Sequence, residues 1–251
     1  MLILLPPSET KRDGGTDDRL DLSSLSFPKL KTRRAEVVRA VRTLARDADA
    51  SATSLKLSPG LAAVEVARNR RLTLSPTMSV LDRYTGVVFD GLDASSLPDA
   101  ARSFAFSHVG VHSALFGPIL AGDRIPAYRL SHDSRVPGLA AASLKRHWAL
   151  AASDVLAKHP GLLLDFRSEG YVGLGPVDAR PNSYFLRVFT VGPDGSRRAL
   201  NHFNKKAKGE LTRALVLAGE DFSSVDDLVA WAASAGFDLR VSAPAELTLT
   251  V

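Results

Sequence analysis

The sequence predicts a single domain of the α/β class, in which helices and strands are mixed along the chain (α+β) around a mixed sheet. The chain has 251 residues, of which 45% are hydrophobic, and this is enough for one domain to bury a core. It begins with the apolar run Met1–Leu5, which Pro6 and Pro7 end, as is typical of an interior strand. Segments with helical and strand-like spacing then follow without regular βα alternation and without an internal repeat. We therefore expect one compact domain over residues 1–251.

After the first strand, the sequence predicts a long loop and then an arginine-rich helix. Residues 10–29 are polar and contain Gly14-Gly15 and Pro28, so we expect a loop, and long loops in compact domains are commonly functional or mobile. From Thr32 onward, apolar side chains follow helical spacing, namely Val37, Val41, Leu44 and Ala48. Arginines occupy much of the remaining helix surface; they are Arg33, Arg34, Arg39, Arg42 and Arg46.

Residues 51–71 predict two short helices joined by a turn. We expect the turn at Pro59-Gly60, and residues 62–71 have helical spacing. The segment resembles a helix-hairpin-helix, in which a glycine turn offers backbone N–H groups to a phosphate. The segment has one glycine, and an ordinary helical hairpin is the alternative.

The rest of the chain predicts further helices and strands in mixed order. Expected helices cover residues 79–84, 96–105, 139–158 and 204–218, and a last one runs from the caps Ser223 and Ser224 through Ala233. Expected strands cover residues 108–112 and 162–166, with loops at 116–118 and 122–129. Pro193-Asp194-Gly195 predicts a hairpin between residues 184–191 and 198–203, and residues 239–241 and 246–251 predict a terminal hairpin.

Composition excludes several classes of site. Lys and Arg number 32 against 27 Asp and Glu, giving a net charge of +5, which permits polyanion binding without requiring it. Cysteine is absent, so disulfides, cysteine–zinc sites, iron–sulfur clusters and thiol switches are excluded. The first apolar run is too short for a signal peptide, and no later run is long enough for a membrane span. We expect a soluble, cytoplasmic protein with neither a membrane partner nor a disulfide partner.

The segment Asn201–Leu211 carries the clearest functional signal. It places Lys205, Lys206 and Lys208 where a strand-like run is expected to give way to a helix. Helix starts expose unpaired N–H groups and the positive end of the dipole, so they favour anions. A phosphate, a carboxylate or a nucleic-acid backbone is the expected ligand, and a solvated basic helix face is the alternative.

Signatures of catalysis and of metal binding are missing. The chain contains no GxSxG, HExxH, Walker A or GxGxxG motif. His108 and His112 are four residues apart, but their valine-rich surroundings predict a strand, and no third ligand is placed near them. Glu169 follows a strand and is a candidate general base, with a solvated turn carboxylate as the alternative. We therefore expect no metal and no cofactor.

Several segments taken together resemble the YaaA peroxide-stress protein family. They occur in the family's order and span nearly the whole chain; they are Met1–Lys11, Ser113–Gly117, Pro126–Leu130, Arg167–Tyr171 and Phe203–Gly209. The chain departs from the family pattern at three places. Glu9 stands at the place of a usual lysine, with Lys11 following Thr10; Phe116 replaces a tyrosine; and Phe203-Asn204 precedes the lysine pair.

The resemblance implies a single compact α/β domain of unusual topology that contains a helix-hairpin-helix-like element. It also implies a positively charged cleft, binding to duplex DNA, and a role in protection from hydrogen peroxide, partly through limiting free iron. Phosphate-backbone contacts of this kind position a protein without reading base sequence. The residues expected to contact DNA or another phosphate-bearing ligand are Lys11, Arg68, Arg70, Arg71, Arg129, Lys205, Lys206 and Lys208.

Two other functions remain open from the sequence. The first is an enzyme acting on a nucleotide or another anionic substrate, although we favour a non-enzymatic protein. Such an enzyme would draw on a set of polar residues, namely Thr10, Lys11, Tyr128, Arg129, Ser168, Glu169, Tyr171 and Lys205. The second is an iron-handling or partner-binding protein, for which the sequence offers no ligand cluster.

The positions of the loops predict one shared cleft. Loops at strand ends commonly gather on one side of a sheet, so we expect Lys11, Arg129, Glu169 and Lys205 to line it together. Glu169 is expected to neutralise part of the positive charge and to hold a lysine or Arg129. The alternative places these residues on separate solvated loops.

Overall fold

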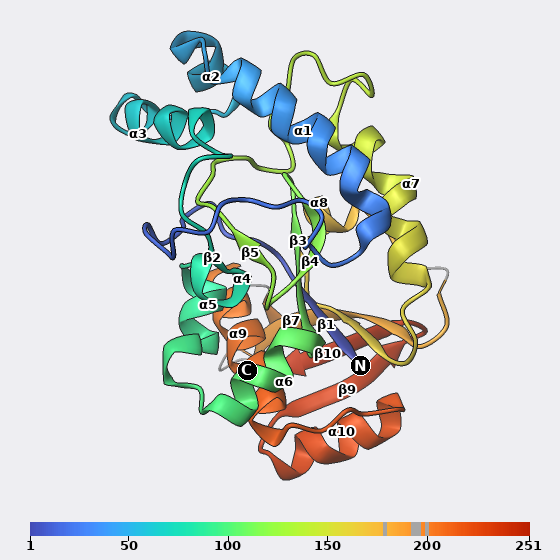
Figure 1. Ribbon diagram of the computed structural model, residues 1–251. Helices are drawn as coiled ribbons and strands as arrows, with labels where there is room; N and C mark the ends of the chain where they lie inside the picture. Colours follow the sequence, from blue (N-terminus) through green and yellow to red (C-terminus); the bar gives the residue numbers. More distant parts are fainter. Residues whose placement is uncertain (178–179, 192–196, 199–200) are drawn as a thin grey trace.

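A mixed β-sheet runs through the centre of the molecule (Figure 1). The structure is a computed structural model that describes residues 1–177, 180–191, 197–198 and 201–251. From one edge to the other, the strand order is β4 (Gly117–Leu120), β3 (Val109–Ser113), β1 (Leu2–Leu5), β6 (Leu163–Asp165), β7 (Ser183–Val191), β10 (Glu246–Thr250) and β9 (Asp238–Ala243). The two-residue strand β8 (Arg197–Arg198) pairs with β7. The predicted hairpin turn Pro193-Asp194-Gly195 lies outside the described residues.

The centre of the sheet is parallel and its edges are antiparallel. β1 pairs in parallel with β3 on one side and with β6 on the other, which confirms the interior strand predicted from its continuous apolar run. β6, β7 and β10 continue the parallel part, whereas β4 and β9 pair antiparallel with their neighbours. The chain goes from β1 to β3 in one direction and later places β6 on the opposite side of β1. The loops after β1 and β6 therefore diverge at a topological switch point of the sheet.

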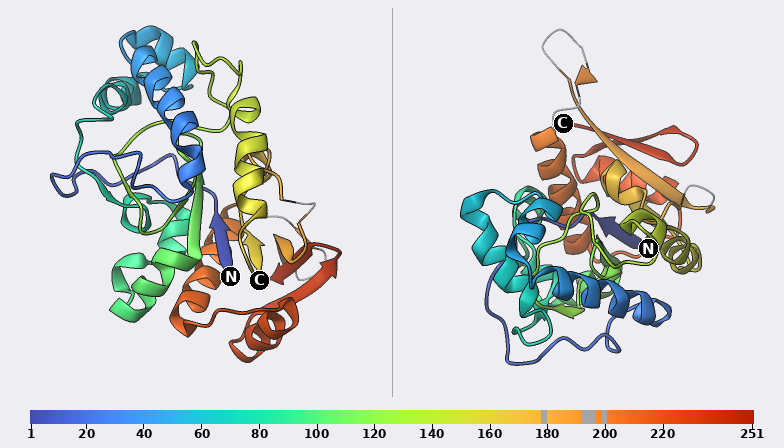
Figure 2. Two further views of the ribbon diagram at one scale, coloured as in Figure 1. Left: turned by 45° about the vertical axis from the view of Figure 1, so that its right-hand side comes forward. Right: turned by 90° about the horizontal axis from the view of Figure 1, so that it is seen from above.

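Two groups of helices flank the strands in Figures 1 and 2. One contains α1 (Lys31–Leu44), which follows the 3-10 helix Pro28–Leu30, and α7 (Leu144–Ala157). The other contains α5 (Val87–Leu92), α6 (Asp99–His108) and α9 (Asn201–Ala218). The remaining elements are α2 (Ala48–Ser54), α3 (Pro59–Arg70), β2 (Met78–Ser79), α4 (Val80–Arg83), a 3-10 helix at Ala94–Ser96, β5 (Arg124–Ile125), α8 (Glu169–Val172) and α10 (Val225–Ser234). The described helices include none with the length and apolarity needed to cross a membrane.

The mixed α/β class predicted from the sequence is confirmed, and so is the terminal hairpin, which β9 and β10 form. Several boundaries differ. Pro59 and Gly60 open α3 rather than forming the preceding turn, because proline fits the first turn of a helix, where its missing N–H costs nothing. α7 begins at Leu144, where the Ser143 side chain accepts a bond from the backbone N–H of Arg146. His108 ends α6 instead of sharing a strand with His112.

Arg34 is an exception to the expectation that arginines occupy the remaining surface of α1. Its side chain is completely buried and donates hydrogen bonds to four backbone carbonyls, which belong to Leu25, Ser26, Phe116 and Pro118. Burial lowers the pKa of this guanidinium to about 10, which still leaves it charged at neutral pH. Arg34 therefore ties α1 to the turn between β3 and β4.

Two glycines bring α5 and α9 into backbone contact. A Cβ atom added at Gly209 would lie 2.0 Å from the carbonyl oxygen of Val88, and one added at Gly91 would lie 2.5 Å from the carbonyl oxygen of Lys206. Such distances leave no room for any side chain at the crossing. This contact fixes the position of α9, and with it the lysines on that helix.

Candidate functional site

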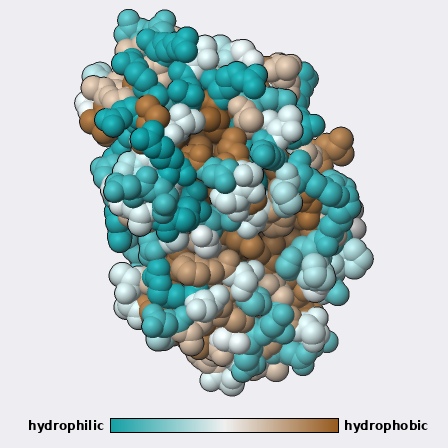
Figure 3. Space-filling view, in the orientation of Figure 1, coloured by the Kyte–Doolittle hydropathy of each residue, from teal (hydrophilic) through white to brown (hydrophobic). Residues whose placement is uncertain are grey.

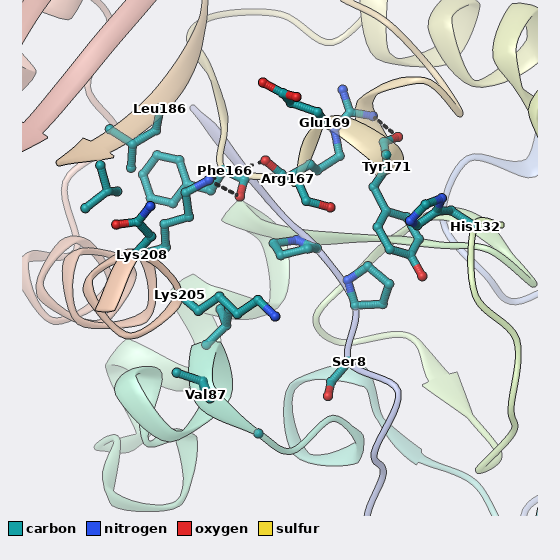
Figure 4. Close-up of a pocket in the computed structure, with 18 of the residues that line it drawn as sticks. Ser8, Val87, His132, Phe166, Arg167, Glu169, Tyr171, Leu186, Lys205 and Lys208 are labelled. Atoms are coloured by element: carbon teal, nitrogen blue, oxygen red, sulfur yellow. Dashed lines mark hydrogen bonds between the residues drawn. The ribbon is translucent and has the colours of Figure 1, made fainter. Parts of the chain in front are cut away.

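A cleft of about 880 Å³ opens at the switch point of the sheet (Figure 4). The loop after β1 and the loop after β6 form two of its walls, as the topology predicts. α5 with its N-cap Gly86, β7, α9 and the loop residues 131–132 supply the rest. The lining residues are 6–9, 86–89, 131–132, 166–171, 185–189, Asn204, Lys205 and Lys208.

Two lysines of α9 reach the cleft from one face of the helix, three positions apart. Lys208 is partly buried, and its Nζ donates to the carbonyl oxygens of Phe166 at 3.0 Å and Arg167 at 3.3 Å. Desolvation lowers the pKa of Lys208 to about 8. Lys205 is exposed, and its side chain makes no hydrogen bond or ion pair with the described residues. α9 begins at Asn201, so these lysines lie beyond its first turn, which corrects the predicted position at the helix start.

The loop after β6 is held in place by a buried arginine. The Arg167 guanidinium binds both carboxylate oxygens of Asp165, at 2.8 Å from Nε and 2.5 Å from NH2. It also donates to His112 Nδ1 at 2.7 Å and to the Gly175 carbonyl at 3.0 Å. Arg167 is completely buried, and each of its three guanidinium nitrogens donates a hydrogen bond inside the protein. Its role in the cleft is to position the loop rather than to meet a ligand.

Glu169 lines the cleft but has a partner other than the predicted one. Its side chain is 82% exposed and lies 3.4 Å from Arg187 of β7, which pairs more closely with Glu246, at 2.6 Å. The expectation that Glu169 holds a lysine or Arg129 is therefore wrong. β7 runs beside β6, so Arg187 is the cation that the topology brings to the start of α8.

Lys11 and Arg129 lie behind the cleft wall rather than on it. Lys11 is buried, and its Nζ donates to the carbonyl oxygens of Ser8 at 2.9 Å and Glu9 at 3.3 Å. It also lies 4.1 Å from the centre of the Tyr128 ring, and burial lowers its pKa to about 7. Arg129 donates to the Glu9 carboxylate at 2.5 Å. Of the four residues predicted to share the cleft, Glu169 and Lys205 line it, while Lys11 and Arg129 support the Ser8–Glu9 segment from behind.

A chain of hydroxyl groups lies beneath Lys11 and was not predicted. The Tyr84 and Tyr128 hydroxyls are 2.7 Å apart, and Ser113 Oγ lies 2.6 Å from the Tyr128 hydroxyl. Ser113 Oγ also accepts from the backbone N–H groups of Leu115 and Phe116. The three residues come from distant parts of the chain, so no local spacing in the sequence could reveal the chain.

The other basic residues predicted to bind phosphate differ in how free they are. Arg68 pairs with Asp13 and Glu65, both at 2.8 Å, and Lys206 pairs with Glu210 at 3.1 Å. Arg70 donates to the Ala45 carbonyl across the gap between α1 and α3. Arg71 is exposed and has no side-chain partner among the described residues.

A second cationic surface lies between α1 and α3. Arg39 and Arg42 are exposed on α1 and Arg46 is exposed just after its end, and with Arg70 they line a hollow of about 400 Å³. We call these four residues the arginine face. The lining of this hollow contains no carboxylate. In Figure 3 the upper part of the molecule, where α1 and α2 lie, is largely hydrophilic.

Metal-ligating side chains do not gather in the described part of the chain, where no three His, Cys, Asp or Glu residues are grouped to hold an ion. His112 is buried and bound to Arg167 through Nδ1, whereas His108 stacks on Phe104 within α6. The two histidines therefore belong to different environments.

Comparison with known proteins matches the chain to a single protein family. A family profile described as "Peroxide stress protein YaaA" matches residues 1–242. A UPF0246 protein of Corynebacterium efficiens is 39% identical over 100% of this chain and 99% of its own length. UPF0246 proteins of Corynebacterium glutamicum and Streptomyces coelicolor are 38% and 37% identical, over 100% and 98% of this chain and 99% and 94% of their own lengths.

Proposed function

Because the chain belongs to the peroxide stress protein YaaA family, we propose that it acts in the peroxide response as a cytoplasmic protein that binds duplex DNA through its phosphate backbone. The single observation that carries this proposal is the arginine face. It presents cations with no carboxylate among the residues that line its hollow. A phosphate backbone is a polyanion that exposed arginines neutralise.

The spacing of these arginines suits a backbone. Arg39 and Arg42 lie three positions apart on α1, so they share one side of it, and Arg46 follows just beyond the end of that helix at Leu44. Arg70 of α3 and the neighbouring Arg71 extend the cationic surface beyond α1. Guanidinium groups match phosphate oxygens in pairs, and they stay charged at every physiological pH.

The proposal narrows the set of phosphate contacts expected from the sequence. Arg70 and Arg71 stay in it, and Arg39, Arg42 and Arg46 join them. Arg68, Lys206 and Arg129 are paired with carboxylates, and Lys11 is buried, so we place these four outside it. The helix-hairpin-helix role of α2 and α3 remains a prediction, because Gly60 lies within α3 rather than in the connecting turn.

Fluorescence anisotropy with a labelled duplex of about 20 base pairs tests the proposal. The double variant Arg42→Gln/Arg46→Gln removes two contacts, so the slope of log K against log salt should fall by about two units. Affinity should fall alike on unrelated sequences. The control Lys56→Gln/Lys158→Gln removes the same charge from two exposed lysines that are ion-paired elsewhere, and it should leave the slope within about half a unit.

Two results would contradict the proposal. One is a DNA affinity that does not change between low and physiological salt. The other is an equal decrease of the salt slope in the arginine variant and in the lysine control. A third variant, Lys205→Gln/Lys206→Gln, tests the basic segment of α9. If it lowers the salt slope and the arginine variant does not, then DNA lies along α9 and not on the arginine face.

A further inference from the structure

We propose that the cleft at the β1–β6 switch point binds one small organic phosphate that carries a flat ring, of the class and size of a nucleoside monophosphate. This site goes beyond the DNA binding proposed above, because it uses different residues on different helices. It is also independent of that proposal, so either can fail alone.

The position and the size of the cleft support a small ligand. In open sheets with a parallel centre, ligands bind outside the carboxyl ends of strands where the strand order reverses. Here the residues after β1, Pro6–Glu9, and those after β6, Phe166–Tyr171, face each other across such a point. The volume of about 880 Å³ lies within the range of about 300–1,000 Å³ usual for small-molecule sites.

Unused donors in the cleft support an anionic group on that ligand. An ammonium group has three N–H donors. Lys208 uses two of them on backbone carbonyls and keeps one, and Lys205 uses none on the described residues. Neither lysine has a carboxylate within ion-pair distance in the part of the chain that the structure describes. Four donors on one helix face match the three oxygens of a terminal phosphate.

The walls beside these lysines support a flat apolar group. In Figure 4, Val87 lies on the same side of the cleft as the two lysines, and its side chain is half-buried, whereas those of Phe166 and Leu186 are fully buried beneath the wall. The Phe185 ring, which also lines the cleft, lies 5.4 Å from Lys208 Nζ. A ligand with its phosphate at Lys205 can therefore place a ring against apolar side chains. Small-molecule pockets commonly combine an apolar lining with a few polar groups that orient the ligand.

Charge on the rim disfavours duplex DNA in this cleft. The carboxylates of Glu9 and Glu169 lie on lining residues and are 57% and 82% exposed. A duplex presents many phosphates over a broad surface, and some of them would meet these carboxylates. One phosphate at Lys205 avoids that repulsion, so the lining favours a single small ligand.

Isothermal titration of the full chain with each of the four common nucleoside 5′-monophosphates tests this site, with adenosine and inorganic phosphate as separate probes. At least one nucleotide should bind with one-to-one stoichiometry and more tightly than either probe. Lys205→Gln should weaken that binding by about tenfold or more. The matched control Lys206→Gln changes the neighbouring residue, which pairs with Glu210 outside the cleft, and it should alter affinity by less than about twofold.

Lys205 is exposed, so its variant is expected to fold, and thermal unfolding verifies this before titration. If none of the four nucleotides binds below about 1 mM, the inference is wrong. It is also wrong if Lys206→Gln weakens binding as much as Lys205→Gln does. The variant Arg42→Gln/Arg46→Gln should retain nucleotide binding, so loss of DNA binding and loss of nucleotide binding report on different proposals.

Discussion

The cleft and the arginine face both present positive charge, but their cations are held in different ways. In the cleft, Lys208 is fixed by two carbonyls and its surroundings by the buried pair Arg167–Asp165. On the arginine face, Arg39, Arg42 and Arg46 are exposed side chains without ion pairs among the described residues. The first arrangement defines the place of a single ligand group, whereas the second supplies a diffuse field suited to a polymer. Substitutions and pH changes are therefore expected to act differently on the cleft and on the arginine face.

The largest difference is expected from replacing an arginine by methionine in each region. Arg167→Met leaves Asp165 buried without its partner, and such a loss typically costs about 3–5 kcal/mol. Arg42→Met removes an exposed side chain and should change stability by less than about 0.5 kcal/mol. Urea unfolding measures both. Similar losses at the two positions would contradict the description of Arg167 as the residue that holds the cleft together.

Lys11 should make the stability of the cleft wall depend on pH. Its pKa is about 7 in the folded chain against 10.5 in the unfolded chain. Above pH 7 the unfolded chain therefore binds more protons than the folded chain does. The free energy of unfolding should rise as the pH increases above about 7, and this gain should disappear when the pH is lowered to 7 again. Between pH 7 and 9 the wild type should gain about 2 kcal/mol relative to Lys11→Met.

Urea unfolding at several pH values checks that difference. Arg39→Met is the matched control, because arginine does not titrate in this range. Parallel pH profiles for the wild type and Lys11→Met would show that Lys11 keeps its proton when buried.

A glycine-to-alanine change compares the helices of the two regions. Gly209→Ala places a Cβ 2.0 Å from a backbone oxygen of α5, so α9 must shift, at a cost of about 1–3 kcal/mol. Gly60→Ala in α3 meets no atom within 4 Å and should be neutral or stabilise by up to about 1 kcal/mol. Thermal and urea unfolding measure both. Equal stabilities would mean that the helices at the cleft can separate at little cost.

The smallest expected effect is a change of nucleotide affinity with pH. Lys208 has a pKa of about 8 because burial disfavours its charge, so it loses its proton as pH rises through 8. Nucleotide affinity in the cleft should then fall by up to about tenfold between pH 7 and 9. DNA affinity should stay constant, since guanidinium groups remain charged. Titrations at both pH values measure this, and an equal pH response in the two assays would remove the distinction between the regions.

Local patterns in the sequence predicted much of the fold. The continuous apolar run Met1–Leu5 indicated an interior strand, and it lies between β3 and β6. The terminal hairpin followed from two short runs near the end of the chain. The hydrogen-bond partners of Arg34 could not be predicted from the sequence, because its carbonyl acceptors come from residues 25–26 and 116–118. Helical spacing shows which side of a helix a residue occupies, but it cannot show that distant carbonyls will satisfy a guanidinium.

The candidate site was predictable only in outline. Loops at strand ends were expected to gather on one side of the sheet, and the loops after β1 and β6 do line one cleft. Which side chains point into the cleft does not follow from the order of the strands. Lys11 forms a backbone bridge with Tyr84 that draws it beneath the loop, and Arg129 is engaged by Glu9. Such outcomes depend on pairings between distant segments, which single-residue patterns do not record.

The glycine crossing of α5 and α9 also limits how the pocket can diversify. Helices in backbone contact are already as close as they can come, and any added side chain at the crossing would force them apart. Substitutions there cannot make fine adjustments to the width of the cavity. Changes of selectivity are therefore expected away from the crossing, at lining residues such as 6–9 and 131–132, which belong to loops and not to packed helices. Anyone redesigning this protein for another ligand should vary those loops and leave Gly91 and Gly209 untouched.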